Sequence, residues 1–507
     1  MSELPEQVLQ LKQKGNETLM AGHPLEAIGH YSEAIDLLES SNLPPNAIIL
    51  SNRAQAFIKV ENYGLAIMDA TLAIDTDPSY VKAYYRRGTA NYALNKFKLA
   101  KKDFLKVCKL KPKDRDARLR YSECDKVVKE MAFAAAIQSE ETIPLSESYQ
   151  PNDVIIAKGY DGPHPNGEVM VNGDLDKEDM LFEPGKLPMD FVMAAVQAFK
   201  DQKLIHKRYV ARLLIHCKKY FQSLPSLTEI TLPDQHDEES KIDHAPRITV
   251  CGDTHGQFYD VLNIFNINGY PSSENPYLFN GDFVDRGSFS VEVILTFLLF
   301  KMANPDCIHL QRGNHETKNM NRIYGFEGEV KAKYDDKIFD LFLEVFCELP
   351  LAAVIENKIF VTHGGIPVEP VSLEQVKKIK RGIEPPESGL MSDLLWSDPQ
   401  PFEGKSPSKR GVGFSFGPDI TEAFLEKNGL KMLVRSHEVK EEGYLVEHGG
   451  KTVTVFSAPN YCDSMGNKGA FIHFEKDCEA KYTQFEAVPH PDVRPMAYAA
   501  GMGGLFQ

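Results

Sequence analysis

The sequence predicts two domains of different fold class, an all-α solenoid of repeated helix pairs followed by a layered α/β domain. Its 507 residues are about three times the usual length of one domain. A 34-residue repeat lies near the N-terminus, and short apolar runs that end in polar clusters recur from residue 247 onward. The apolar fraction of 42% and the charged fraction of 25% are typical of globular proteins, so both domains are expected to fold.

The repeat predicts the solenoid. Features of one copy recur 34 positions later, where Ala54, Leu65, Ala66, Asp69 and Pro78 correspond to Gly88, Leu99, Ala100, Asp103 and Pro112; an earlier copy is offset by 39. Small residues let two helices approach closely, and the proline ends the second helix of a unit. The pattern resembles three tetratricopeptide repeats over residues 7–113, with a capping helix that extends the domain to residue 135. The constant spacing disfavours an irregular bundle with chance self-similarity.

Composition predicts the remaining boundaries. Residues 136–184 are rich in Pro, Gly, Ser and acidic residues, which is typical of a linker. Helical periodicity resumes near residue 189, and the strand-like runs follow it. We therefore predict a linker over 136–184, a second domain over 185–490 and a C-terminal tail over 491–507.

Charge and cysteine usage exclude several classes of function. The formal net charge of −15, without a polybasic run, disfavours binding to nucleic acid or an anionic bilayer. The eight cysteines form no C-x-x-C pair, which indicates reduced thiols. The first residues lack a signal pattern, and no run of eighteen apolar residues occurs. We expect a cytoplasmic and nuclear protein without a membrane span.

Polar side chains that follow the apolar runs predict a metal centre. Asp253 and His255 lie two positions apart after one run, so an extended backbone would point both the same way. Taken singly, such residues are more often turn or structural residues, but together they form a set of oxygen and imidazole donors. Such donors favour manganese, iron or zinc, with magnesium as a further alternative. Six ligands fit two ions that share a carboxylate, assigned to Asp282. The set is Asp253, His255, Asp282, Asn314, His363 and His437.

Seven segments carry a family resemblance. In order they are GDTHGQ (252–257), GDFVDRG (281–287), RGNHE (312–316), HGG (363–365), LLWSDP (394–399), RSHE (435–438) and SAPNYCD (457–463). Together they resemble the signature of the phosphoprotein phosphatase family over residues 185–490, and the preceding repeats are similar to its type 5 branch. The resemblance implies a central β-sandwich flanked by helices that hydrolyses phosphoserine and phosphothreonine in proteins. It also implies that Asp253 and His255 bind one ion, that Asn314, His363 and His437 bind the other, and that Asp282 binds both.

The resemblance implies roles for further residues. Two bound ions would lower the pKa of water so that hydroxide attacks the phosphate. His315 would donate a proton to the leaving serine or threonine oxygen, and Asp285 would hold its imidazole in place. Bidentate arginines suit phosphoryl oxygens. For Tyr461, a packed aromatic role stays an open alternative. The implied substrate-binding residues are Arg286, Asn314, His315, Arg410 and Tyr461.

The repeat domain carries a candidate peptide-docking groove. Lys12 and Asn16 are four apart on one predicted helix, as are Lys82 and Arg86 on another, so each pair shares a helix face. With Asn52 they could hold two carboxylates of a peptide C-terminus. The set is similar to the carboxylate clamp of tetratricopeptide domains that bind the C-terminal tail of heat-shock protein 90. A solvated polar face is the alternative.

The resemblance also implies autoinhibition. The repeats would restrain the active site until a chaperone tail or a fatty acid activator engages them, with Glu61 as the contact to the active-site arginines. An exposed acidic loop residue is an equally simple interpretation of Glu61. The tail sequence AYAAGMGGLFQ contains three glycines, each costing about 1 kcal/mol in a helix, which predicts weak bracing of the restrained state.

Two other functions compete with this interpretation. A two-metal phosphoesterase for nucleotides or nucleic acid would share the first motifs, but the later motifs and the acidic composition disfavour it. A catalytically silent scaffold would use the repeats alone. It is disfavoured because all six predicted ligands and His315 are present.

Overall fold

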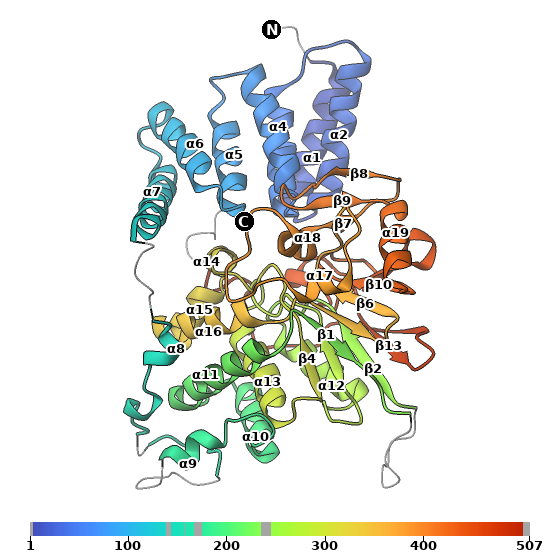
Figure 1. Cartoon of the computed structure of the whole chain (residues 1–507). Helices are drawn as coiled ribbons and strands as arrows, with labels where there is room; N and C mark the ends of the chain where they lie inside the picture. The colour runs from blue at the N-terminus through green and yellow to red at the C-terminus, as the bar shows by residue number, and fades with distance from the viewer. Residues whose placement is uncertain (1–3, 138–142, 158, 167–174, 235–244, 500–507) are drawn as a thin grey trace. The chain divides into compact units, whose positions relative to one another are not determined.

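The computed structural model describes residues 4–137, 143–157, 159–166, 175–234 and 245–499. This part of the chain divides into two compact units (Figure 1). One consists of the N-terminal residues up to 137 together with 407–412, and the other consists of the remaining residues from 143 onward. Within the described ranges, none of the helices combines the length and apolar character that crossing a bilayer requires. Each unit is considered separately below.

The N-terminal unit is all-α, as the repeat period predicts. Each of three successive helix pairs packs internally, and a seventh helix packs on the sixth. The helices are α1 (Glu6–Met20), α2 (Pro24–Ser40), α3 (Ala47–Lys59), α4 (Tyr63–Thr76), α5 (Val81–Ala93), α6 (Phe97–Leu110) and α7 (Arg115–Ile137). The predicted solenoid of three helix pairs with a capping helix is therefore confirmed.

Small residues at the helix crossings explain why the period is visible. A Cβ atom on Gly15 of α1 would lie 2.6 Å from a ring carbon of Tyr31 on α2, and one on Gly88 of α5 would lie 3.2 Å from Phe104 on α6. The close approach of these helices therefore depends on the absence of a side chain. A repeated ion pair follows the same spacing, since Arg53–Asp69 recurs as Arg87–Asp103.

The second unit contains two mixed sheets that share one core. Apolar side chains of both, such as Val250 and Leu278 from one and Val361 and Val434 from the other, belong to one buried cluster, which confirms the predicted β-sandwich. The six-stranded sheet has the order β1 (Leu227–Ile230), β5 (Ala352–Ile355), β6 (Ile359–Thr362), β10 (Met432–Arg435), β12 (Thr452–Val455), β11 (Tyr444–Glu447). The five-stranded sheet has the order β14 (Ala480–Phe485), β13 (Gly469–Glu475), β2 (Arg247–Cys251), β3 (Tyr277–Phe279), β4 (Ile308–Leu310). A small third sheet joins β7 (Asp398–Pro399), β9 (Phe414–Phe416) and β8 (Lys405–Pro407).

Helices flank the sandwich. Phe279 of β3 belongs to a large buried cluster with Phe297 of α13 and Phe342 of α16, while Phe424 of α19 packs on Phe360 of β6 at a ring separation of 5.0 Å. The longer helices are α10 (Met189–Lys200), α11 (Lys207–Ser223), α12 (Phe258–Asn268), α13 (Ser290–Ala303), α15 (Phe326–Lys333), α16 (Asp336–Glu348) and α19 (Pro418–Asn428). The shorter ones are α14 (Lys318–Tyr324), α17 (Leu373–Lys377), α18 (Leu390–Trp396), η2 (His448–Gly450) and η3 (Tyr461–Asp463).

The second unit begins at residue 143, and its first described elements are α8 (Leu145–Ser148), η1 (Pro151–Asp153) and α9 (Leu175–Met180). Arg208 of α11 donates a hydrogen bond to the Val154 carbonyl at 2.7 Å, and Lys218 donates one to Ser146 at 3.0 Å. Phe182 is buried in the large cluster. This segment falls inside the range predicted as a linker, and the boundaries 7–135, 136–184, 185–490 and 491–507 stay predictions.

The C-terminal segment contacts the loop after β3. The Ser288 hydroxyl donates to the Arg494 carbonyl at 2.7 Å, and the Met496 N–H donates to the Arg286 carbonyl at 2.8 Å. The three glycines on which the prediction of weak bracing depends lie at or beyond residue 501, outside the described residues.

Candidate metal centre

The six predicted metal ligands lie just after the C-terminal ends of five strands, β2, β3, β4, β6 and β10. Both sheets of the sandwich therefore contribute side chains to one site. Three of the ligands have left-handed backbone conformations, with φ of 39° at His255, 51° at Asp282 and 70° at His437. Non-glycine residues rarely adopt this conformation, so the loops hold the ligands under backbone strain. All six side chains are buried: Asp253, His255, Asp282, Asn314, His363 and His437.

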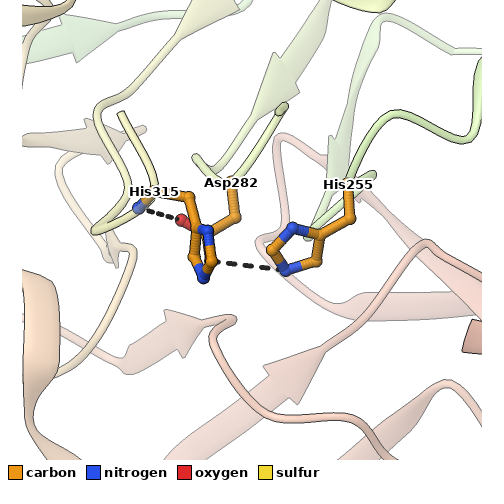
Figure 2. Close-up of side chains that lie close together, drawn as sticks. All are labelled: His255, Asp282 and His315. Carbon is orange, nitrogen blue, oxygen red and sulfur yellow. Dashed lines mark hydrogen bonds and ion pairs between the residues drawn. The ribbon is translucent and has the colours of Figure 1, made fainter. Parts of the chain in front are cut away.

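Asp282 lies at the centre of this arrangement. One of its carboxylate oxygens is 3.5 Å from His255 Nε2, and the other is 3.3 Å from His363 Nε2. Figure 2 shows Asp282 between His255 and His315. Two groups of potential ligands share Asp282, and within each group the donor atoms all lie within 4.8 Å of one another. The groups are His255, Asp282 and His315, and Asp282, His363 and His437.

Hydrogen bonds direct the imidazole lone pairs into the site. His255 Nδ1 lies 3.0 Å from the Val284 carbonyl, and His363 Nδ1 lies 2.8 Å from the Asn280 carbonyl. A carbonyl can only accept, so each Nδ1 carries the proton and each Nε2 presents a lone pair. Burial lowers the pKa of His255 to about 3, which keeps its ring neutral. Both rings are therefore in the form that binds a metal.

The donor set fits divalent cations. Asn314 Oδ1 lies 2.8 Å from His363 Nε2, so two acceptors face each other beside the Asp282 carboxylate. If the Asn314 amide were turned, its nitrogen could donate to the His363 ring and the Asp282 carboxylate. If a cation lay among these groups, the Asn314 oxygen could stay in its present position and bind that cation. Burial, followed by the charge of Asp282, raises the pKa of Asp253 to about 7. Both buried carboxylates lie within 3.7 Å of His255 Nε2, and such a site favours a bound positive charge.

His315 and Asp285 form a buried pair beside the metal centre. His315 Nδ1 lies 2.8 Å from Asp285 Oδ2, and neither side chain is more than 2% exposed. Asp285 also accepts hydrogen bonds from the Asn321 amide at 3.1 Å and the Phe326 N–H at 3.0 Å. Burial raises the pKa of the Asp285 carboxyl, and the donors from Phe326 and Asn321 oppose that shift. The predicted contact between His315 and Asp285 is therefore present.

The remaining predicted substrate-binding residues differ in where they lie. The Arg286 guanidinium stacks on the Tyr324 ring, 3.7 Å from its centre. The half-buried ring of Tyr461 lies 5.2 Å from the ring of the predicted metal ligand His255. Arg410 belongs to the segment 407–412 of the N-terminal unit, where its N–H donates to Ser408 Oγ at 3.1 Å. Its role at the active site stays a prediction.

Sequence reasoning missed Glu316 and Glu329, which organise the loops of the site. The buried Glu316 carboxylate accepts the N–H groups of Asp282, Phe283 and Gly313, each at 2.8 Å. Its place in the RGNHE motif, directly after His315, is the signal that could have identified it. Glu329 accepts the N–H groups of Ser290 and Val291 at the start of α13.

Three of the five predicted docking residues form a hydrogen-bonded chain in the repeat unit. Arg86 Nη1 donates to Asn52 Oδ1 at 3.0 Å, and Asn52 Nδ2 donates to Asn16 Oδ1 at 2.9 Å. Lys12 is half-buried and Lys82 is exposed.

The predicted autoinhibitory residue, Glu61, lies in the loop between α3 and α4, with φ of 61°. Its predicted contact with the active-site arginines stays a prediction.

Comparison with known proteins identifies the same two parts. A family model for calcineurin-like phosphoesterases matches residues 246–441, one for the tetratricopeptide repeat matches residues 81–114, and one described as the PPP5 TPR repeat region matches residues 121–229. The chain is 50% identical over 493 residues to human serine/threonine-protein phosphatase 5, covering 97% of this chain and 92% of the human one.

Two further relatives agree. Serine/threonine-protein phosphatase T of Aspergillus oryzae is 44% identical over 492 residues, covering 96% of each chain. A solved structure of a Saccharomyces cerevisiae serine/threonine phosphatase, described as similar to human phosphatase PP5, is 46% identical with a TM-score of 0.57, covering 61% of this chain and 100% of the yeast one. The chain belongs to the serine/threonine-protein phosphatase 5 family, enzymes that join a tetratricopeptide domain to a metallophosphoesterase domain.

Proposed function

We propose that the site holds two divalent cations, with Asp282 as the shared ligand. Asp253 and His255 would bind one ion, and Asn314, His363 and His437 the other. The observation that carries this proposal is the convergence of imidazole, amide and carboxylate acceptors on Asp282. Manganese is the first metal to test, with iron, zinc and magnesium as alternatives.

Bound divalent cations supply Lewis acidity, which neutralises charge on the phosphate and lowers the pKa of water. The side chains of this chain account for the rest of the reaction. Because His315 Nδ1–H is directed at Asp285, the proton that can reach a leaving serine or threonine oxygen is the one on Nε2. Stacking on Tyr324 fixes the Arg286 guanidinium, which would hold the phosphoryl oxygens. Arg410, Asn314 and Tyr461 complete the proposed substrate site.

Manganese-dependent phosphate release from a phosphothreonine peptide tests this mechanism. After treatment with a chelator, activity should return on adding manganese, and His315→Ala should lower kcat by about 100- to 10,000-fold. His309→Gln is the matched control, because His309 lies on β4 six residues earlier and takes no part in the proposed chemistry. Activity retained in His315→Ala would refute the assignment of the acid, and full activity in the chelated protein would refute the metal mechanism.

The same proposal assigns the repeat groove to a peptide that ends in carboxylates, such as the C-terminal tail of heat-shock protein 90. Arg86 supports it, because its hydrogen bonds go to the neutral groups of Ser51 and Asn52. Burial lowers the pKa of Arg86 to about 10, so a ligand carboxylate would stabilise its charge. Calorimetric titration with the tail peptide should give binding that Arg86→Ala weakens by about 10- to 100-fold. The exposed Lys14→Ala serves as the control, and equal losses in the two variants would contradict the assignment.

Docking is proposed to relieve autoinhibition. The tail peptide or a fatty acid should raise phosphatase activity of the full chain, and Glu61→Ala should raise the activity measured without an activator. Unchanged basal activity in Glu61→Ala would remove Glu61 from the mechanism.

The proposed chaperone partner and the eight free thiols support residence in the cytoplasm and nucleus, which microscopy of the labelled protein would test.

A further inference from the structure

The Tyr31 hydroxyl has no packing role that a phenylalanine could not fill. The Tyr31 ring on α2 covers Gly15 of α1, and Phe104, at the corresponding place in the third repeat, covers Gly88 of α5 in the same way. Both aromatic side chains are fully buried. Since Phe104 packs without a hydroxyl, the oxygen of Tyr31 calls for a separate explanation.

That hydroxyl donates a hydrogen bond to Asn16 Oδ1 at 2.7 Å. Burial raises the pKa of Tyr31 to about 12, so the phenol stays protonated and remains a donor. Asn16 Oδ1 also accepts the hydrogen bond from Asn52 Nδ2. The Asn52 NH₂ group can only donate, so the Asn16 oxygen must face it, and the Tyr31 hydroxyl adds a second hydrogen bond to that same oxygen.

The orientation determines what Asn16 can offer to a ligand. Its oxygen is used within the domain, so its NH₂ group remains as the donor for an incoming acceptor. The Asn52 oxygen accepts a hydrogen bond from Arg86, so the Asn52 amide is held with its oxygen toward Arg86 and its NH₂ group toward Asn16. The groove therefore presents amide and guanidinium donors, the chemistry that binds a peptide carboxylate.

We propose that Tyr31 is a positioning residue of the docking groove, whose hydroxyl, together with the Asn52 amide, holds the Asn16 side chain in the position that binds a carboxylate-ended peptide. The inference rests on the proposed docking function. It adds a residue from the neighbouring helix that takes part through Asn16 rather than by touching the peptide.

Binding of a heat-shock protein 90 C-terminal peptide to the full chain tests this proposal. Tyr31→Phe keeps the ring and should weaken binding about two- to tenfold, the effect of one hydrogen bond. In an Asn16→Ala background, the same substitution should cause no further loss, because the group it orients is absent. Tyr85→Phe is the matched control, since the Tyr85 hydroxyl pairs with Asp116 in the same domain and should leave affinity unchanged.

The outcomes separate the two proposals. No binding by the unaltered protein would overturn the docking function itself. Binding of equal strength by Tyr31→Phe would overturn only the role of Tyr31. A loss of the same size in the Asn16→Ala background, or in Tyr85→Phe, would also overturn it, because the effect would then not pass through Asn16.

Discussion

Replacing Asp285 by asparagine should remove the support of His315 while keeping the volume of the side chain. Asp285 accepts from His315 Nδ1, Asn321 and Phe326. An amide has only one accepting oxygen, so either orientation sets its NH₂ group against a donor. If the oxygen faces Phe326, the NH₂ group meets Nδ1 of His315 and opposes the protonated imidazole. If it faces His315, the NH₂ group meets the N–H of Phe326.

The expected loss combines two effects. A hydrogen bond to a charged group contributes about 1.5–3 kcal/mol, and general acid catalysis contributes about 100- to 10,000-fold. For a phosphothreonine peptide we expect kcat to fall by about 100- to 1,000-fold, which corresponds to about 3–4 kcal/mol. An aryl phosphate has a leaving group that needs little protonation, so its kcat should fall by about tenfold or less.

The assay is steady-state kinetics with both substrates at saturating manganese. Asp260→Asn is the matched control, because Asp260 is also buried and accepts from a backbone N–H at 2.9 Å and a side-chain amide at 2.8 Å, but forms no hydrogen bond with the proposed acid His315. Equal losses for the two substrates in Asp285→Asn would refute the reasoning, since they would show that Asp285 does not act through protonation of the leaving group.

Three further results are expected. Glu316→Gln should weaken manganese binding by about 10- to 100-fold in calorimetric titration, because the carboxylate that anchors three backbone N–H groups is lost; unchanged affinity would contradict this. Gly15→Ala should lower the free energy of unfolding of the repeat unit by about 1–3 kcal/mol through the clash with Tyr31, whereas Gly29→Ala, where nothing lies within 4 Å, should raise it; equal effects on the thermal midpoint would contradict the packing argument. Burial lowers the pKa of Lys301 to about 8, below its value of about 10.4 in the unfolded chain. Between these two pH values the unfolded chain binds the proton more tightly, so the free energy of unfolding should rise with pH in the unaltered protein relative to Lys301→Met. Parallel curves of stability against pH for the two proteins would contradict this expectation.

The sequence predicted the elements that depend on local periodicity. The spacing of Gly15, Ala54 and Gly88 revealed the helix pairs, because each repeat must solve the same packing problem. The positions of Asp253 and His255 after an apolar run indicated the candidate metal centre, because strand ends meet at one edge of a sheet.

Contacts between distant segments could not be predicted in this way. The approach of Asp285 to His315 depends on a turn in which Asp285 has φ of 72°, which no spacing rule gives. The packing of Val154 and Phe182 within the second unit depends on isolated contacts, such as the hydrogen bond from the buried Arg208 of α11, which leave no periodic pattern. The role of Tyr31 required the position of Asn16, a residue on another helix.

The left-handed backbone at His255, Asp282 and His437 also bears on how this enzyme can be engineered. Each such residue costs on the order of 1 kcal/mol relative to glycine in the same conformation. A screen for thermal stability alone would therefore reward glycine or asparagine at these three positions, and so select proteins that melt higher but have lost the proposed metal ligands. Selection for a more stable form of this phosphatase therefore has to measure turnover as well as stability, because substitutions at the site itself can raise stability while they abolish activity.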